Sequence, residues 1–224
     1  MSKQPSKIGK YKILSQIGEG GMGAVFKAEH PTLNRIVIIK KLTTASSQDF
    51  IERFRREAKI MMDFRNEHIV QVYDHFKEGD SYFIVMEFVD GITLENLIQK
   101  KRYFSNQAAI LIFTEICSAL KYAHDQMVIH RDIKPANILI SKEGVVKLVD
   151  FGVSTSLDNN SEEGLTKVGM TIGTPSYLAP EQIANAKNRD KRTDIYSMGV
   201  MFYEMVVGKK PFQGGFTPEI IAST

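Results

Sequence analysis

The 224-residue sequence contains no tryptophan and a single cysteine, Cys117. One cysteine excludes an internal disulfide and favours a reducing compartment. Cys117 stands in a stretch of helical spacing among apolar residues, so we expect a small buried hydrophobic side chain and not a reactive thiol. No apolar run approaches the roughly 20 residues that a membrane-spanning helix needs. We therefore expect a cytoplasmic protein, or the cytoplasmic part of a longer, membrane-anchored protein.

The sequence also lacks long runs of one charge. Its 29 Lys and Arg residues and 26 Asp and Glu residues are spread along the chain and leave a net charge of +3. This pattern argues against a nucleic-acid partner and against adhesion to a membrane surface. The hydrophobic content of 43% and charged content of 25% are those of an ordinary globular protein. The length suffices for one large domain or two small lobes.

The chain up to about residue 89 has the pattern of β-strands. β-Branched and aromatic residues stand between turn signals there. One helix is expected around residues 50–61, because Phe50, Phe54, Ala58 and Met61 recur at helical steps. The strands are expected at 11–17, 24–29, 36–42, 70–75 and 82–86.

Beyond Asp90 the pattern becomes helical. Ser105 is a plausible N-cap of a long helix, and a second helix is expected at about 194–207, ending at Gly208. We therefore predict an α+β fold with two lobes. The predicted divisions are a flexible segment at 1–10, a strand-rich lobe at 11–89 and a helical lobe at 90–224.

A glycine-rich segment, Gly18–Gly23, fits the pattern G-x-G-x-x-G. Alone, this pattern also suits a flexible hairpin turn or the fingerprint of a dinucleotide site, but the latter must open a helix. The residues that follow, 24–28, have a strand pattern instead. A glycine loop between two strands lets backbone amides approach phosphate groups.

Two further motifs supply polar groups suited to phosphate chemistry. His130–Asn137 reads H-R-D-x-x-x-x-N, and Asp150-Phe151-Gly152 follows after two short expected strands. Such a hairpin would bring Asn137 and Asp150 together. Amide and carboxylate oxygens are ligands that Mg²⁺ prefers.

Together these motifs resemble the protein kinase family, and Lys134 resembles the Ser/Thr branch. The glycine loop and Leu178–Gln182 are similar to those of bacterial members. The resemblance implies a bilobal kinase fold, with a small antiparallel sheet and one helix in the N-lobe and a mainly helical C-lobe. The family continues with further helices, so the C-lobe is expected to lack its last helices. The chain is then expected to be a fragment of a longer protein; the less favoured alternative is a short form whose stability depends on a partner.

The resemblance assigns catalytic roles to four residues. Asp132 would accept the proton of the substrate hydroxyl, and Lys134 would neutralise charge on the moving phosphoryl group. Lys40 would bind nucleotide phosphates and pair with Glu57. Asn137 and Asp150 would hold Mg²⁺, or Mn²⁺ in its place.

The resemblance also implies an ATP site, with Met86 as gatekeeper and residues 87–89 as the hinge that binds adenine. The usual alanine of the V-A-I-K strand is Ile38 here. Extra methylenes in a packed site cost ~1–3 kcal/mol, which would weaken ATP binding by about 5- to 150-fold without compensation. The expected nucleotide-binding residues are Ile17, Gly18, Gly20, Gly23, Val25, Ile38, Lys40, Met86, Glu87, Val89 and Leu139.

Residues 150–181 resemble an activation loop that ends in Ala179-Pro180-Glu181. An Arg beside the catalytic Asp is typical of kinases activated by phosphorylation of this loop. Thr174 would bond the catalytic Asp and Lys, and Asp194 would cap the backbone of the catalytic loop. The expected regulatory residues are Arg131, Arg53, Thr166, Thr171 and Thr174, although Thr166 and Thr171 can also be ordinary loop hydroxyls.

The hypothesis with most support is an ATP-dependent protein Ser/Thr kinase. Its expected partners are ATP, protein substrates with Ser or Thr acceptors, and a second kinase copy for autophosphorylation. The alternative is a catalytically weak or inactive kinase-fold module that binds or scaffolds other proteins, because Ile38 departs from the family pattern. Phosphorylation of a small molecule on the same fold is less favoured, since residues 173–181 resemble a peptide-binding segment.

Overall fold

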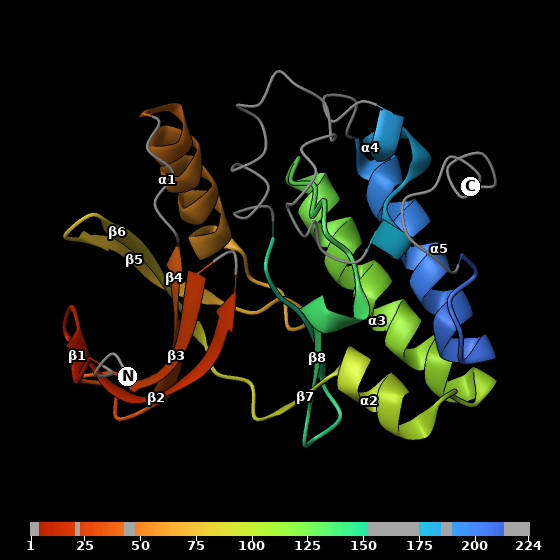
Figure 1. Ribbon diagram of the computed structural model, residues 1–224, viewed down its shortest axis with the longest axis horizontal. Coiled ribbons are helices and arrows are strands. Elements are labelled where there is room, and N and C mark those ends of the chain that lie inside the picture. The colour runs from red at the N-terminus through yellow and green to blue at the C-terminus, as the bar shows by residue number, and fades with distance from the viewer. Residues whose placement is uncertain (1–4, 21–22, 43–47, 152–174, 185–189, 213–224) are drawn as a thin grey trace. The chain divides into compact units, whose positions relative to one another are not determined.

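The computed structural model describes residues 5–20, 23–42, 48–151, 175–184 and 190–212. The chain forms two compact units, coloured in sequence order in Figure 1. The first unit comprises Met1–Asn66 and Val70–Asp90, and the second comprises Glu67–Ile69 and Gly91–Thr224. The short segment Glu67–Ile69 therefore clusters with the second unit although it precedes residue 90.

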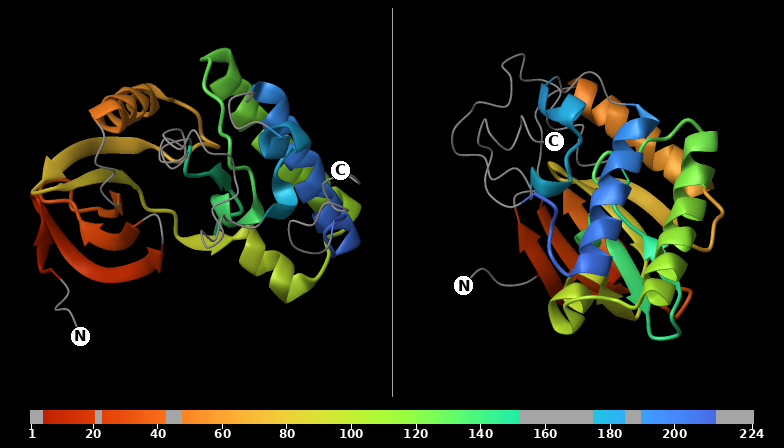
Figure 2. Two further views of the ribbon diagram at one scale, coloured as in Figure 1. Left: turned by 45° about the horizontal axis from the view of Figure 1, so that its top comes forward. Right: turned by 90° about the vertical axis from the view of Figure 1, so that its right-hand side faces the viewer.

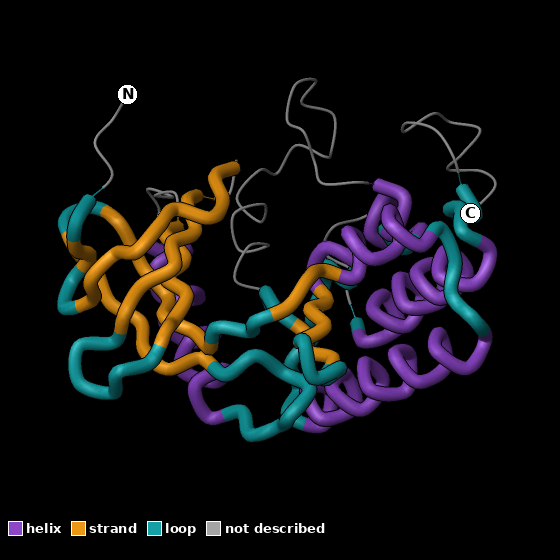
Figure 3. The backbone as a smooth tube through the Cα atoms, turned by 90° about the horizontal axis from the view of Figure 1, so that it is seen from below, coloured by secondary structure: helices purple, strands orange, loops and turns teal. Residues whose placement is uncertain are grey.

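The first unit is built on a six-stranded antiparallel sheet, drawn in orange in Figure 3. Its strand order is β1-β2-β3-β4-β6-β5. The pattern of β-branched and aromatic residues predicted five of these strands correctly, and the structure adds the two-residue β1. The strands are β1 (Lys7–Ile8), β2 (Tyr11–Gly20), β3 (Gly23–Glu29), β4 (Ile36–Leu42), β5 (Val72–Glu78) and β6 (Ser81–Glu87).

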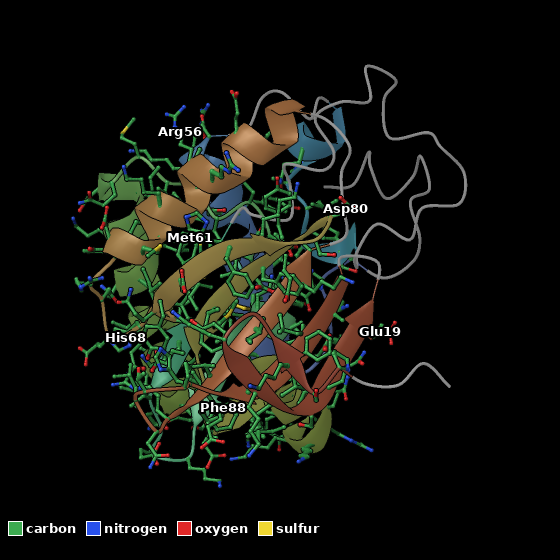
Figure 4. The ribbon with its side chains drawn as sticks, turned by 90° about the vertical axis from the view of Figure 1, so that its left-hand side faces the viewer. Glu19, Arg56, Met61, His68, Asp80 and Phe88 are labelled. Atoms are coloured by element: carbon green, nitrogen blue, oxygen red, sulfur yellow. The ribbon has the colours of Figure 1, made fainter. Side chains whose placement is uncertain are left out.

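The predicted helix of the first unit is α1, Gln48–Asp63, which packs against β5. Met61 is buried against the sheet, whereas Arg56 lies on the outer side of the helix (Figure 4). In the core of the first unit, the rings of Phe76 and Phe83 stack with their centroids 5.2 Å apart. This core fixes the strands that carry the expected nucleotide residues.

The second unit combines a three-stranded sheet with helices. The hydroxyl of Ser105 accepts a 3.3 Å hydrogen bond from Ala108 N, which confirms Ser105 as the N-cap of α3. Helices α3 and α5 lie side by side in both views of Figure 2. The elements are β7 (Gly91–Thr93), α2 (Leu94–Lys101), α3 (Asn106–Asp125), η1 (Pro135–Asn137), β8 (Ile138–Ser141), β9 (Val146–Leu148), η3 (Pro175–Tyr177), α4 (Pro180–Ala184) and α5 (Lys191–Val207).

Two expectations about these helices need correction. Cys117 is exposed on α3 and is not a buried hydrophobic residue. The buried residues of α3 include Ile116 and Ala119, so Cys117 occupies the outward side between them. Helix α5 begins at Lys191, before the predicted start at 194, because Asp190 caps it by accepting a hydrogen bond from Arg192 N.

The segment Glu67–Ile69 extends the small sheet of the second unit. Ile69 forms a parallel bridge with Leu148 in β9. Leu148 N donates a 2.8 Å hydrogen bond to the carbonyl of His68. The strand that precedes Asp150 is thereby supported on both sides, by β8 and by this segment. In the described part of the chain, no helix has the length and apolar character needed to cross a membrane.

Candidate functional site

The second unit gathers three of the predicted functional side chains at one point. Lys134 Nζ lies 2.7 Å from one carboxylate oxygen of Asp132 and 3.0 Å from the other. Asn137 Nδ2 donates to the same carboxylate at 2.9 Å and to the Asp132 carbonyl at 2.7 Å. The carboxylate of Asp132 is therefore oriented by two donors, and its side chain keeps 29% of its surface exposed. Each carboxylate oxygen has two acceptor positions, so the group can still accept a hydrogen bond from a substrate hydroxyl.

A single helical turn produces this arrangement. Pro135 is the first residue of η1, where its fixed φ suits the turn and its missing N–H is not needed. Asn137 N closes the turn by donating to the carbonyl of Lys134 at 2.9 Å. The turn brings the side chain of Asn137, only 6% exposed, back toward Asp132. The sequence H-R-D-x-x-x-x-N therefore encodes a compact loop in which the side chain of Asn137 is hydrogen-bonded to Asp132.

Asp194 of α5 supports the loop that carries Asp132. One of its carboxylate oxygens accepts from His130 N at 2.9 Å, and the other accepts from Arg131 N at 2.8 Å. His124 on α3 lies 2.8 Å from the same carboxylate. Asp194 is 1% exposed, so these groups replace the water that a buried charge would otherwise need. The predicted capping role of Asp194 is confirmed.

His130 is buried and neutral in this setting. Its Nδ1 accepts a 3.3 Å hydrogen bond from Asp132 N, which leaves the proton on Nε2. That nitrogen then donates to the carbonyl of Val149 at 2.8 Å. Burial lowers the pKa of His130, although Asp194 opposes this shift. The neutral ring connects the loop of Asp132 to the strand before Asp150, and it packs on Phe151 at 4.6 Å between centroids.

Two residues of the site adopt the left-handed backbone conformation that favours glycine. Arg131 has φ 70° and Asp150 has φ 62°. Such strain costs on the order of 1–3 kcal/mol and persists only where neighbouring contacts impose it. The contacts are present: Asp194 binds the amide of Arg131, and Val149 N donates to the Asn137 carbonyl at 3.0 Å. These contacts fix the directions of the Asp132 and Asp150 segments.

Asn137 and Asp150 suit a divalent cation in the chemistry of their donor atoms. Both Nδ2 hydrogen bonds of Asn137 point to Asp132. Its Oδ1 therefore faces away and can act as a ligand. Among the described residues, no group of three or more His, Cys, Asp or Glu side chains could hold a metal ion. A cation at this site would consequently need oxygen atoms from phosphate and water to complete its shell.

In the first unit, strand register aligns the predicted nucleotide residues on one face of the sheet. Val25 pairs with Lys40, which pairs with Ile84. In the next row, Ile38 pairs with Met86. Directly opposite residues share a face, so Lys40, Val25, Ile38 and Met86 line the same surface. Ile38 is half-buried there, and its four-carbon side chain reduces the room on this face.

Two glycines of the G-x-G-x-x-G segment have different reasons to be glycine. Gly23 has φ 122°, and a Cβ atom there would lie 1.9 Å from the carbonyl oxygen of Lys41. The fold itself therefore excludes a larger residue at Gly23. At Gly18 the nearest atom to an added Cβ would be Val25 Cβ at 3.7 Å, which is an ordinary contact. The fold thus accepts a side chain at Gly18, and its glycine leaves space above the face that carries Lys40.

The predicted hinge, residues 87–89, begins at the last residue of β6. Glu87 N donates to the carbonyl of Gln71 at 2.9 Å, and the Glu87 carboxylate accepts from Gln71 N at 3.2 Å. Val89 is half-buried, and Ile17 at the end of β2 is 54% exposed. Gly20 pairs with Gly23 at the end of the β2–β3 hairpin. Leu139 lies on β8 in the second unit, whereas the other predicted nucleotide residues belong to the first.

The Pkinase family, described as the protein kinase domain, matches residues 11–223. The chain belongs to the protein kinase family. A probable serine/threonine-protein kinase of Clostridium perfringens strain 13 is 40% identical over 207 residues, which make up 92% of this chain and 30% of that protein. Serine/threonine-protein kinase PrkC of Bacillus subtilis strain 168 is 40% identical over 208 residues, with 92% and 32% covered. The chain thus spans about a third of these relatives.

A solved structure gives the same answer for the fold. Crystalline Rad53 1-466 in complex with AMP-PNP superposes with a TM-score of 0.78 and 28% identity. The match covers 95% of this chain and 52% of Rad53 1-466. The predicted bilobal α+β kinase fold and the predicted resemblance to bacterial Ser/Thr kinases are confirmed.

Several predictions for this kinase domain concern residues that the structure does not describe. Thr166, Thr171 and Thr174 lie outside the described residues. Arg53 belongs to α1, but its side chain is not described either. Lys40 is 8% exposed on β4 and Glu57 is half-buried on α1. Their pairing remains a prediction.

The sequence reasoning missed side chains that support the kinase domain from α4 and α5. Gln182 accepts a 3.0 Å hydrogen bond from Ala179 N and donates to the Arg131 carbonyl at 3.4 Å, so it joins Ala179 to the loop that carries Asp132. The buried hydroxyl of Tyr177 donates to Glu204. Gln182 directly follows Ala-Pro-Glu in the sequence, which is the only signal that could have indicated its role.

Proposed function

We propose that this domain is the catalytic part of an ATP-dependent protein kinase that transfers the γ-phosphoryl group of Mg-ATP to Ser or Thr hydroxyls of proteins. The observation that carries the proposal is the cluster of Asp132, Lys134 and Asn137, supported by Asp194. Phosphoryl transfer depends mainly on positioning and on charge neutralisation, and this cluster supplies both. The names of the bacterial relatives favour Ser/Thr as acceptors.

In the proposed reaction, the substrate hydroxyl donates a hydrogen bond to Asp132 and points toward the γ-phosphorus. A bond forms between the hydroxyl oxygen and phosphorus while the bond to the bridging oxygen of ADP breaks. Asp132 takes up the hydroxyl proton, and Lys134 offsets negative charge on the transferred group. The exposed fraction of Asp132, 29%, leaves room for this approach.

The chemistry of the remaining residues supports Mg-ATP as the phosphoryl donor. Members of the protein kinase family generally use ATP with Mg²⁺, and Rad53 was solved with AMP-PNP. Asn137 Oδ1 and the Asp150 carboxylate would hold the cation, or Mn²⁺ in its place. When bound, the cation neutralises phosphate charge. Lys40 and the glycines at 18, 20 and 23 would contact the phosphates, and the 87–89 backbone would bind adenine.

Radiolabelled ATP with a generic protein substrate tests the proposal. We expect label on phosphoserine or phosphothreonine and none on phosphotyrosine. The matched variant is Asp132→Ala, measured together with its unfolding temperature to show that it folds. Equal labelling by the wild type and by a folded Asp132→Ala variant would contradict the proposal. It would favour the alternative, a weak or inactive kinase-fold binding module.

We further propose regulation by autophosphorylation of the activation loop between two kinase copies in the cytoplasm. The support is Arg131, which directly precedes Asp132 in the sequence. Its guanidinium group would bind a phosphate on Thr166 or Thr171. Mass spectrometry of the incubated protein tests this. Phosphate only outside residues 150–181 would contradict it.

A further inference from the structure

The shortest cation–ring contact in the described residues lies beside the proposed adenine hinge. Lys27 Nζ is 4.3 Å from the centroid of the Phe88 ring. The other four contacts of this kind are longer, between 5.0 and 5.6 Å. Both Lys27 and Phe88 are half-buried, so the contact is partly shielded from solvent. Figure 4 labels Phe88, which lies close to the strands of the first unit.

The two residues belong to segments that do not pair with each other. Lys27 is on β3 and pairs with Ile38 of β4, which pairs with Met86 of β6. Phe88 is the second residue after Met86 and lies just beyond the end of β6. The Lys27 side chain therefore reaches past the Ile38 position to the hinge, on the face that carries Lys40.

Phe88 needs such support because the sheet no longer holds it. The hydrogen-bonded register of β6 ends with Glu87, which pairs with Val37. Beyond that point the path of the backbone depends on side-chain contacts. Glu87 N already donates to Gln71, so the Glu87 carbonyl and the backbone groups of residues 88 and 89 are those that we expect to bind adenine. Their positions therefore depend on what holds the Phe88 ring.

We propose that Lys27 is a positioning residue for nucleotide binding. Its ammonium group holds the ring of Phe88 and thereby keeps the hinge backbone in the conformation that receives the purine. Without this contact, part of the binding free energy is used to order the hinge. This inference rests on the proposed function, because it concerns the affinity of the same nucleotide site. Lys27 touches neither the phosphoryl group nor the acceptor hydroxyl in this proposal, so the turnover of bound substrate should not change.

The test compares Lys27→Met with wild type in the full-length protein. Methionine keeps the length and apolar stem of lysine but removes the charge. We measure the Kd of Mg-ADP by calorimetry and, separately, KM for ATP and kcat. A cation–π contact at a partly exposed site corresponds to about two- to fivefold in affinity. We expect Kd and KM to rise by about that factor while kcat stays within experimental error. Lys27→Arg should restore both, since a guanidinium also stacks on an aromatic ring.

Two controls separate this role from a loss of charge or of packing. Lys41→Met removes a lysine that neighbours Lys40 on β4 but is exposed, and it should leave the Kd of Mg-ADP unchanged. Phe88→Leu keeps an apolar side chain without the ring. In that background Lys27→Met should have no further effect.

Each outcome has a distinct meaning. If Lys27→Met weakens Mg-ADP equally in the Phe88→Leu background, or no more than Lys41→Met does, the positioning role is refuted while the proposed function stands. If the wild type binds no Mg-ADP at all, the proposed function itself fails.

Discussion

Replacement of Asp194 by alanine should show how far the activity depends on the support that Asp194 gives to the loop of Asp132. The carboxylate is 1% exposed and accepts hydrogen bonds from the amides of His130 and Arg131 at 2.9 and 2.8 Å. The His130 amide is buried and the Arg131 amide is partly buried. A buried amide left without an acceptor costs ~1–3 kcal/mol, so the two together cost at most ~2–6 kcal/mol. Domains of this kind have about 5–15 kcal/mol of stability in total. The Asp194→Ala variant should therefore fold but melt well below the wild type.

The expected fall in melting temperature is at least about 4 °C, because 1 kcal/mol corresponds to ~2–4 °C in a domain of this size. Activity should fall further than stability explains, since Arg131 keeps its φ of 70° only while Asp194 binds its amide. Once this residue relaxes, Asp132 loses its direction. Asp194→Asn retains one acceptor oxygen, so its melting temperature and activity should lie between those of the wild type and Asp194→Ala.

The assay combines thermal unfolding with phosphoryl transfer measured well below the melting temperature. Asp190→Ala is the matched control, because Asp190 caps the same helix but its side chain is 53% exposed. Loss of this cap should cost ~0.5–2 kcal/mol and leave kcat unchanged. If Asp194→Ala matches Asp190→Ala in both melting temperature and kcat, the assignment of Asp194 as the clamp of the catalytic loop is wrong.

Three further predictions concern Gly18, Gly23 and the pH dependence of stability. Gly18→Ala should leave the melting temperature nearly unchanged, because the fold has room for the methyl group. The same methyl group would crowd a packed nucleotide site, so the affinity for Mg-ADP measured by calorimetry should fall by about 5- to 150-fold. An unchanged affinity would show that no phosphate approaches Gly18. Gly23→Ala should lower the melting temperature, since its Cβ would lie 1.9 Å from Lys41 O, and a wild-type value would contradict the described hairpin. Burial lowers the pKa of His130 from its ordinary value of 6.5 in the folded chain. Below pH 6.5 this histidine therefore binds a proton in the unfolded chain but stays neutral in the folded chain. Urea unfolding should accordingly show stability falling as the pH drops below 6.5, by up to ~1.4 kcal/mol per pH unit, with a shallower slope in His130→Asn; equal slopes would refute it.

The sequence predicted the elements of this fold well where spacing and chemistry agree. Strands β2 to β6 and helix α1 have clear periodic patterns, and the cap residues Ser105 and Gly208 hold the positions expected of them. Cys117 shows the limit of such patterns. Its neighbours in sequence are apolar, but burial depends on which side of the helix meets α5, and one step along a helix turns a side chain by about 100°.

The candidate site likewise has a part that the sequence predicted and a part that it did not. The loop from His130 to Asn137 could be predicted because a contiguous motif specifies both its residues and its turn. The contacts of Gln182, Tyr177 and Lys27 were not predicted, because each involves a partner more than 20 residues away that only tertiary structure brings near. The left-handed conformations of Arg131 and Asp150 were likewise unforeseen, since non-glycine residues seldom adopt them, although Asp does so more often than Arg.

The most direct test of the account is the turnover of Asp132→Asn, which replaces one carboxylate oxygen by an amide of the same size. We predict that kcat falls by at least about 100-fold, because the proton acceptor is lost. The Kd of Mg-ADP and the melting temperature should stay close to the wild-type values, since Lys134 and Asn137 remain in place. An Asp132→Asn variant that transfers phosphate as fast as the wild type would contradict the central claim that this carboxylate receives the substrate proton.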